Sequence, residues 1–160
     1  MPFMFNQRTG RSMVVFTTTL CLLSIFLSAQ HVAVKTGTLL YETGNAMFRG
    51  KTSFTVTESG GANLVWEQAG HQQHFEGQIA GKPLQQLFSK AYDVVHTPPV
   101  FPQRSGKPDE SRTHLKWTQG EESKDLVFWS GERYAFADLN ELIQLLEQQI
   151  RKISGEKVKY

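Results

Sequence analysis

The fold is decided between residues 52 and 79, where the chain reads TSFTVTESGGANLVWEQAGHQQHFEGQI. From Thr52 to Glu58 apolar and polar side chains alternate, as they do along a half-buried β-strand. Ser59-Gly60-Gly61 then supplies two glycines that accept a positive φ, which is typical of a tight hairpin turn. The segments 63–67 and 71–79 alternate in the same way on either side of a second turn. We therefore predict an antiparallel meander of three strands over this stretch.

Two amphipathic helices are predicted after the meander. Pro83 suits the first turn of one helix, because the missing N–H of proline has no intrahelical partner there, and Pro98 ends it. In the other helix, Asp138 and Glu141 have the spacing of a capping box, and Gly155 is well placed as the stop. The apolar stripes are Leu84, Leu87, Phe88, Ala91, Tyr92 and Val95 in the first helix, and Leu139, Leu142, Ile143, Leu146, Ile150 and Ile153 in the second.

Further strand-like sequence lies before the meander and between the helices. We predict strands at 113–118 and 125–129, a short one at 134–136, and one at 38–41 that ends in a turn at Gly44-Asn45. The segment 125–129 is nearly all apolar, which favours a strand covered on both faces. The order strands, helix, strands, helix predicts an α+β fold: an antiparallel sheet of about five to six strands with both helices on one face.

The first 30 residues have the composition of a secretory signal peptide. Arg8 and Arg11 precede an uncharged run from Met13 to Ser28, and Ser28-Ala29-Gln30 offers small residues where a signal peptidase would cleave. The uncharged stretch from Ser12 to Val34 is also long enough to cross a bilayer as an uncleaved anchor. We favour cleavage and hence an exported protein, secreted or periplasmic, that contacts a membrane only if the leader is retained.

One domain is expected after the leader. We predict an uncertain N-terminal segment at 31–50, a single α+β domain at 51–155 and a basic tail at 156–160. Without the two leader arginines, the chain has 15 basic and 15 acidic residues. A neutral domain lacks the positive field that nucleic acid binding requires, so no nucleic acid partner is expected. The only cysteine, Cys21, lies in the leader and leaves the domain without a disulfide or a cysteine-based zinc site.

Motifs for catalysis are not found. On a strand His74 and Glu76 share a face, whereas His71 points to the other, and zinc takes three or four ligands. His96 and His114 could complete such a site, but no spacing rule places them near it. Neither a nucleophile elbow nor a phosphate-binding loop occurs. We therefore expect no metal, no cofactor and no enzymatic activity, with a metal-dependent enzyme kept as an alternative.

The sequence gives more support to a binding function than to catalysis. The segment 96–111 holds four of the six prolines of the chain. Ordered connections are mostly about 4–6 residues long, so this one is expected to be an exposed, partly extended loop. It is either a plain connector or a binding element, since a preformed extended segment loses little entropy when it enters a groove or a protease cleft. The candidate binding residues are Pro98, Pro99, Phe101 and Pro102 of this loop, and Ser59, Gly60 and Gly61 of the hairpin turn.

The three tryptophans, Trp66, Trp117 and Trp129, all fall on predicted strands. Core packing is the ordinary expectation for them. A tryptophan that faced outward beside Tyr134 would instead be an anchor for a protein partner.

The passage from Ser59-Gly60-Gly61, through the first helix, to Gly106-Lys107-Pro108-Asp109 and the strand Thr113-His-Leu-Lys-Trp117 resembles the emfourins. Emfourins are small bacterial proteins that inhibit protealysin, a thermolysin-like metalloprotease. The resemblance covers about residues 52 to 153 and implies the α+β fold and an inhibitory role. We thus expect an exported binding module for a protein partner such as a protease, with a membrane-anchored, envelope-associated structural domain as the alternative.

Overall fold

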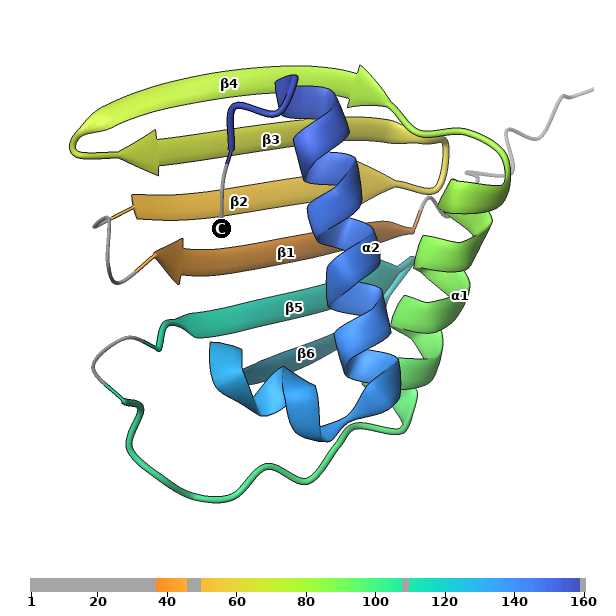
Figure 1. Cartoon of the computed structure of the whole chain (residues 1–160). Helices are drawn as coiled ribbons and strands as arrows, with labels where there is room; N and C mark the ends of the chain where they lie inside the picture. The colour runs from red at the N-terminus through yellow and green to blue at the C-terminus, as the bar shows by residue number, and fades with distance from the viewer. Residues whose placement is uncertain (1–36, 46–49, 108–109, 159–160) are drawn as a thin grey trace, which may run out of the picture. The chain divides into compact units, whose positions relative to one another are not determined.

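A computed structural model of the chain describes residues 37–45, 50–107 and 110–158, so the expected leader at 1–30 lies outside the described residues. In chain order the elements are β1 (Thr38–Asn45), β2 (Gly50–Thr57), β3 (Gly61–Gln68), β4 (His71–Gln78), α1 (Lys82–His96), β5 (Arg112–Gln119), β6 (Glu122–Trp129), the 3₁₀-helix η1 (Ser130–Ala135) and α2 (Ala137–Ser154) (Figure 1). No helix within these residues has both the length and the apolar character needed to cross a membrane.

The six strands form one antiparallel sheet in the order β4-β3-β2-β1-β5-β6. The predicted α+β class and the meander β2-β3-β4 are therefore confirmed. Strand β1 lies in the middle of the sheet, where it pairs with β2 on one side and β5 on the other. The segment 31–50, which the sequence left uncertain, thus supplies a central strand. The turn expected at Gly44-Asn45 is wrong, because both residues continue the pairing with β2.

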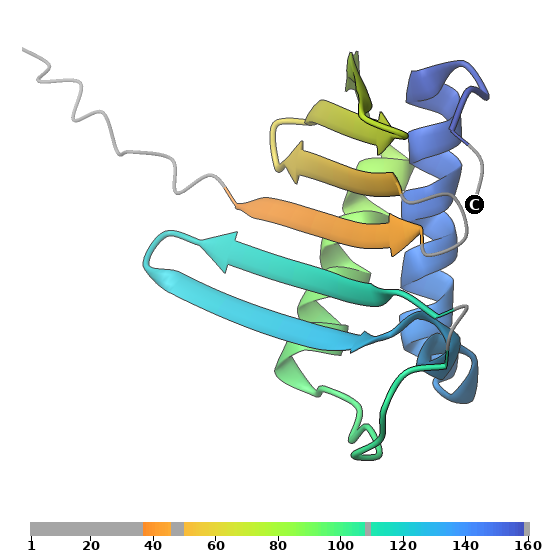
Figure 2. The same ribbon diagram turned by 90° about the vertical axis from the view of Figure 1, so that its left-hand side faces the viewer.

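Helices α1 and α2 lie on the same face of the sheet (Figures 1 and 2). The inward-facing side chains of the strands alternate with outward-facing ones, and Leu39, Phe54, Leu64 and Leu115 are fully buried under the helices. Each such side chain contributes about 1.5–3 kcal/mol when it leaves water. The outward-facing side chains of the strands are largely polar. No described helix covers that face of the sheet (Figure 2).

The helix boundaries follow the sequence with one exception. Helix α1 starts at Lys82 with Pro83 in its first turn, and α2 ends at Ser154, where the C-cap residue Gly155 has the left-handed φ of 60°. The predicted capping box of Asp138 and Glu141 is wrong: α2 begins at Ala137, and no side chain caps it. Asp138 lies inside the first turn, where its carboxylate faces the positive end of the helix dipole.

Two predictions for the segment after β5 are also wrong. Residues 134–136 are not a strand, because η1 carries the chain from β6 to the start of α2. The Glu132 carboxylate stabilises this turn by accepting a hydrogen bond of 2.8 Å from the Trp129 backbone N–H. The apolar segment 125–129 is not covered on both faces, since β6 is an edge strand and Val127 is 46% exposed.

Candidate functional site: a pinned proline-rich loop

The connection from α1 to β5 is described at residues 97–107 and 110–111, and Arg104 lies beside the end of β6. The sequence predicted an exposed loop here, and Pro98, Val100 and Pro102 are indeed exposed. The loop is nevertheless fixed to the domain, through a polar network at its C-terminal half and an aromatic contact at Phe101. These two anchors determine which of its residues point into solvent.

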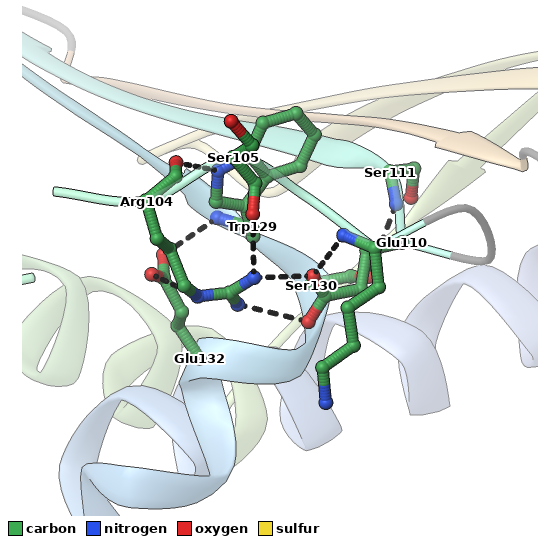
Figure 3. A network of polar contacts seen from close by, with 8 residues as sticks. Arg104, Ser105, Glu110, Ser111, Trp129, Ser130 and Glu132 are labelled. Carbon is green, nitrogen blue, oxygen red and sulfur yellow. Dashed lines mark hydrogen bonds and ion pairs between the residues drawn. The ribbon is translucent and has the colours of Figure 1, made fainter. Parts of the chain in front are cut away.

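Arg104 is the centre of the polar network (Figure 3). Its Nη1 and Nη2 atoms donate hydrogen bonds to Glu110 Oε2 and Oε1 at 2.6 and 2.9 Å. Its Nε lies 3.2 Å from Glu132 Oε1, an ion pair without hydrogen-bond geometry. The Lys107 backbone N–H adds a hydrogen bond of 2.9 Å to Glu110 Oε2. The loop is therefore closed on itself and tied to η1.

The charges of this network reinforce one another. The hydrogen bonds from the Arg104 guanidinium, and then that from the Lys107 N–H, lower the pKa of Glu110 to about 2. The Glu110 carboxylate in turn raises the pKa of Arg104. Both partners consequently stay ionised near neutral pH, and the two-pronged arginine–carboxylate geometry fixes their orientation as well as their distance.

The C-terminal half of the loop packs against the side chain of Trp129. Its indole Nε1–H donates to the Arg104 carbonyl oxygen at 3.2 Å. Gly106 lies so close to the ring that a Cβ there would come within 2.5 Å of it. The Arg112 guanidinium carbon is 5.3 Å from the ring centroid. Trp129 is half-buried by these contacts, so it serves the loop itself rather than standing free as a partner anchor.

Phe101 anchors the other half of the loop. Its ring stacks on Phe128 with centroids 5.4 Å apart and meets the edge of Phe136 at 5.3 Å. The prediction that Phe101 belongs to an exposed binding surface is thus modified: the side chain is half-buried against the core. Its neighbour Val100 points the other way and is 90% exposed, more than any other large hydrophobic side chain of the described residues.

A groove of about 680 Å³ lies beside this exposed segment. It runs between the C-terminal part of α1 and the start of α2, and Pro99 forms part of its wall. Lys90 and Asp93 on α1 and Asp138 on α2 add charged groups to a lining that is otherwise mixed. The groove can accept an apolar side chain next to polar groups at its rim.

The hairpin turn Ser59–Gly61 does not join this surface. It lies between β2 and β3, which β1 and β5 separate from β6 and the loop. Gly60 is buried with a φ of 91°, and its carbonyl accepts a hydrogen bond of 2.9 Å from the Ile79 N–H. Gly61, expected to share the positive φ, is instead the first residue of β3. The turn connects the hairpin to the end of β4, and only Ser59 is exposed.

The histidines considered as metal ligands are spread over the fold. As expected, His74 and Glu76 share the polar face of β4, whereas His71 has the opposite orientation. His96 Nε2 lies 3.0 Å from Glu122 Oε1, and His114 Nε2 lies 2.6 Å from Asp125 Oδ1. Among the described residues, no three histidine, cysteine or carboxylate side chains are arranged to hold a metal ion.

The important contacts of the loop were not visible in the sequence. Arg104, Glu110 and Glu132 are ordinary surface charges by spacing, and no sequence rule pairs residues across an irregular loop. Gly106 was the one usable signal, because a glycine in a proline-rich segment indicates close approach of another group.

These features define a class of protein: a small α+β domain that holds a proline-rich loop rigidly at one edge of an antiparallel sheet. Comparison of the chain with protein-family models, curated proteins and solved structures finds no match.

Proposed function

We propose that this protein is an exported, non-enzymatic binding module that acts by occupying the surface of a partner protein. Residues 97–102 make the contact, and Val100 is its centre. The observation that carries the proposal is the 90% exposure of Val100 on a loop that is pinned on its C-terminal side at Phe101 and Arg104. A rigidly held, exposed apolar side chain can anchor a protein partner with little loss of conformational entropy.

The local sequence Thr97-Pro98-Pro99-Val100-Phe101-Pro102 restricts its own backbone. Each proline fixes φ near −65°, and the residue before each proline is held in an extended conformation. Little conformational entropy remains to be lost when such a segment binds, which strengthens binding without any new contact. Extended segments of this kind fit the grooves in which proteins bind peptides.

A protease cleft is the groove that we favour as the binding site. Proteases bind their substrates in an extended form, and a segment that is held rigid resists the distortion that cleavage requires. The resemblance to the emfourins points to a thermolysin-like metalloprotease as the class to test. The groove beside Pro99, which has both charged and apolar groups in its lining, lies next to the same segment and widens the area that a partner could bury.

A titration tests this proposal. The purified protein is added to thermolysin-like proteases in increasing molar ratio, and we expect hydrolysis of a peptide substrate to fall. Val100→Asp places a charge at the centre of the contact and should weaken inhibition at least about tenfold. Val127→Asp, the same change at a second exposed valine, which lies on β6, should inhibit as the unmodified protein does. Full protease activity at a large molar excess would rule out the inhibitory role.

Export is a separate part of the proposal, and it rests on the composition of the leader. Mass spectrometry of the protein isolated from its native compartment gives the mature N-terminus. A chain that begins near residue 30 supports a secreted or periplasmic module. An intact Met1 supports the alternative, a domain held at a membrane by its leader.

A further inference from the structure

We propose that this protein pairs with a second copy of itself through the edge strand β4, and that the two six-stranded sheets become continuous. Strand β4 pairs with β3 on one side and has no described strand on the other. Its outward-facing backbone N–H and C=O groups form a row that another strand can complete. This surface is separate from the proline-rich loop, so the inference does not depend on the proposed function.

The two edges of the sheet differ in how they are protected. Natural edge strands avoid pairing through lysines, prolines, bulges or a covering loop. Strand β6 carries Lys124 and Asp125, and the loop at Arg104 covers its Trp129 end. Strand β4, with the sequence HQQHFEGQ, contains neither lysine nor proline and pairs residue for residue with β3 without a bulge. Within the part of the chain that the structure describes, the β4 edge therefore lacks the protection that β6 has and can take a further strand.

One register makes β4 complementary to itself. When Phe75 lies opposite Phe75 of the second copy in an antiparallel pair, His74 of each copy lies opposite Glu76 of the other. The two-fold symmetry repeats this imidazole–carboxylate pair, and both side chains are exposed on the polar face. A shift of two residues in one direction puts the two His74 rings together, and a shift in the other direction puts the two Glu76 carboxylates together. An imidazole directly across an antiparallel pair can donate a hydrogen bond to a carboxylate, whereas two carboxylates placed there repel each other.

The helical layer leaves room for this pairing. The last turn of α2 lies over Gly77, where a Cβ would come within 2.9 Å of Ile153. In the proposed register Gly77 and its counterpart are four residues apart along the strands, about 13 Å. The two helix ends therefore lie on opposite sides of the symmetry axis, displaced by more than the diameter of about 10 Å that a helix requires. Phe75, half-buried beneath Lys157, lies at the axis and can contact its counterpart.

Charge reversal tests both the pairing and its register. Sedimentation velocity of the purified full chain over a range of concentrations should show a monomer–dimer equilibrium. His74→Glu places two like-charged pairs in the interface and should weaken the dimer about tenfold. The double variant His74→Glu with Glu76→His exchanges the two partners and should restore the dimer. His71→Glu alters the net charge equally but lies outside the complementary pairs, so it should have little effect.

Cross-linking tests the register without reliance on charge. In a Cys21→Ser background, chains with His74→Cys mixed with chains with Glu76→Cys should form a disulfide on mild oxidation, because opposite residues in a strand pair are close enough. Chains with His74→Cys alone should form far less. A protein that stays monomeric at every concentration, or a dimer that does not respond to His74→Glu, would overturn the proposal. Equal cross-linking in the mixture and in the sample of His74→Cys chains alone would overturn it as well. Association through any other part of the chain would not respond to the exchange of His74 and Glu76.

Discussion

Gly60 and Gly106 are positions where one added methyl group would meet a neighbour that cannot easily move. At Gly106 the obstacle is the ring of Trp129, and at Gly60 it is the carbonyl oxygen of Ile79, 2.1 Å from an ideal Cβ. Gly60 also has a φ of 91°, which L-residues rarely adopt. The exit from β2 toward β3 thus depends on a residue without a side chain.

Gly60→Ala is therefore expected to lower the free energy of unfolding by at least about 3 kcal/mol, because backbone strain and a steric clash act together. Gly70→Ala is the matched control. Gly70 has a similar φ of 80°, but no atom lies within 4 Å of its ideal Cβ, so only the strain of about 1 kcal/mol should remain. Urea unfolding of both variants gives the comparison. Equal losses would mean that the close approach of Ile79 has no energetic effect.

Elements that a local pattern defines were predicted well, and elements that tertiary contacts define were not. The meander β2-β3-β4 and the helices α1 and α2 follow from alternation, from the i, i+3, i+4 spacing and from glycine and proline at their ends. The short helix η1 has no such pattern. It depends on the Glu132 carboxylate, which binds the Trp129 N–H behind it and lies beside Arg104 of a distant loop. A sequence window does not contain both partners.

A largely buried ion pair joins η1 to α2. Arg133 Nη1 donates a hydrogen bond to Glu147 Oε1 of α2, and its Nη2 donates to the Tyr134 hydroxyl at 3.0 Å. Both side chains of the pair are largely buried, with Glu147 at 11% exposure. Burial raises the pKa of the neighbouring Tyr41, and the Glu147 charge raises it further, so a neutral phenol lies beside the pair.

Glu147→Ala is expected to destabilise the protein by about 2 kcal/mol, because it leaves the Arg133 guanidinium buried without its carboxylate. The double variant Arg133→Met with Glu147→Leu removes both charges and should recover most of this loss. Thermal or urea unfolding of the single and double variants completes the cycle. A double variant as unstable as the sum of the two single ones would show that the charges do not act as a pair.

The arrangement of the whole molecule could be predicted only in part. Alternating strands with two amphipathic helices define an α+β sheet, and this was confirmed. The strand order was not predictable, because β1 has an ambiguous sequence and gains its central place by pairing with β5 across 70 to 80 residues of chain. The candidate site shows the same limit. The prolines indicated a loop, but the ion pair that fixes it joins residues whose types and spacing carry no signal.

That ion pair makes the stability of the whole fold depend on acidity. Folding lowers the pKa of Glu110 from 4.5 to about 2, through its hydrogen bonds from Arg104 and Lys107. The folded state therefore binds the proton less tightly than the unfolded state does. A carboxylate of this kind stabilises the fold fully above pH 4.5 or so, and the contribution is lost as the pH falls toward 2.

Glu110→Gln should accordingly be less stable than the unmodified protein at neutral pH, and the difference should shrink between about pH 5 and pH 2. Urea midpoints measured at a series of pH values test this directly. Glu121→Gln, in the exposed turn between β5 and β6, changes the net charge by the same amount and is the control. If the difference for Glu110→Gln stays constant down to pH 2, or if both variants converge alike, the acid response belongs to the net charge and the Arg104 network does not produce it.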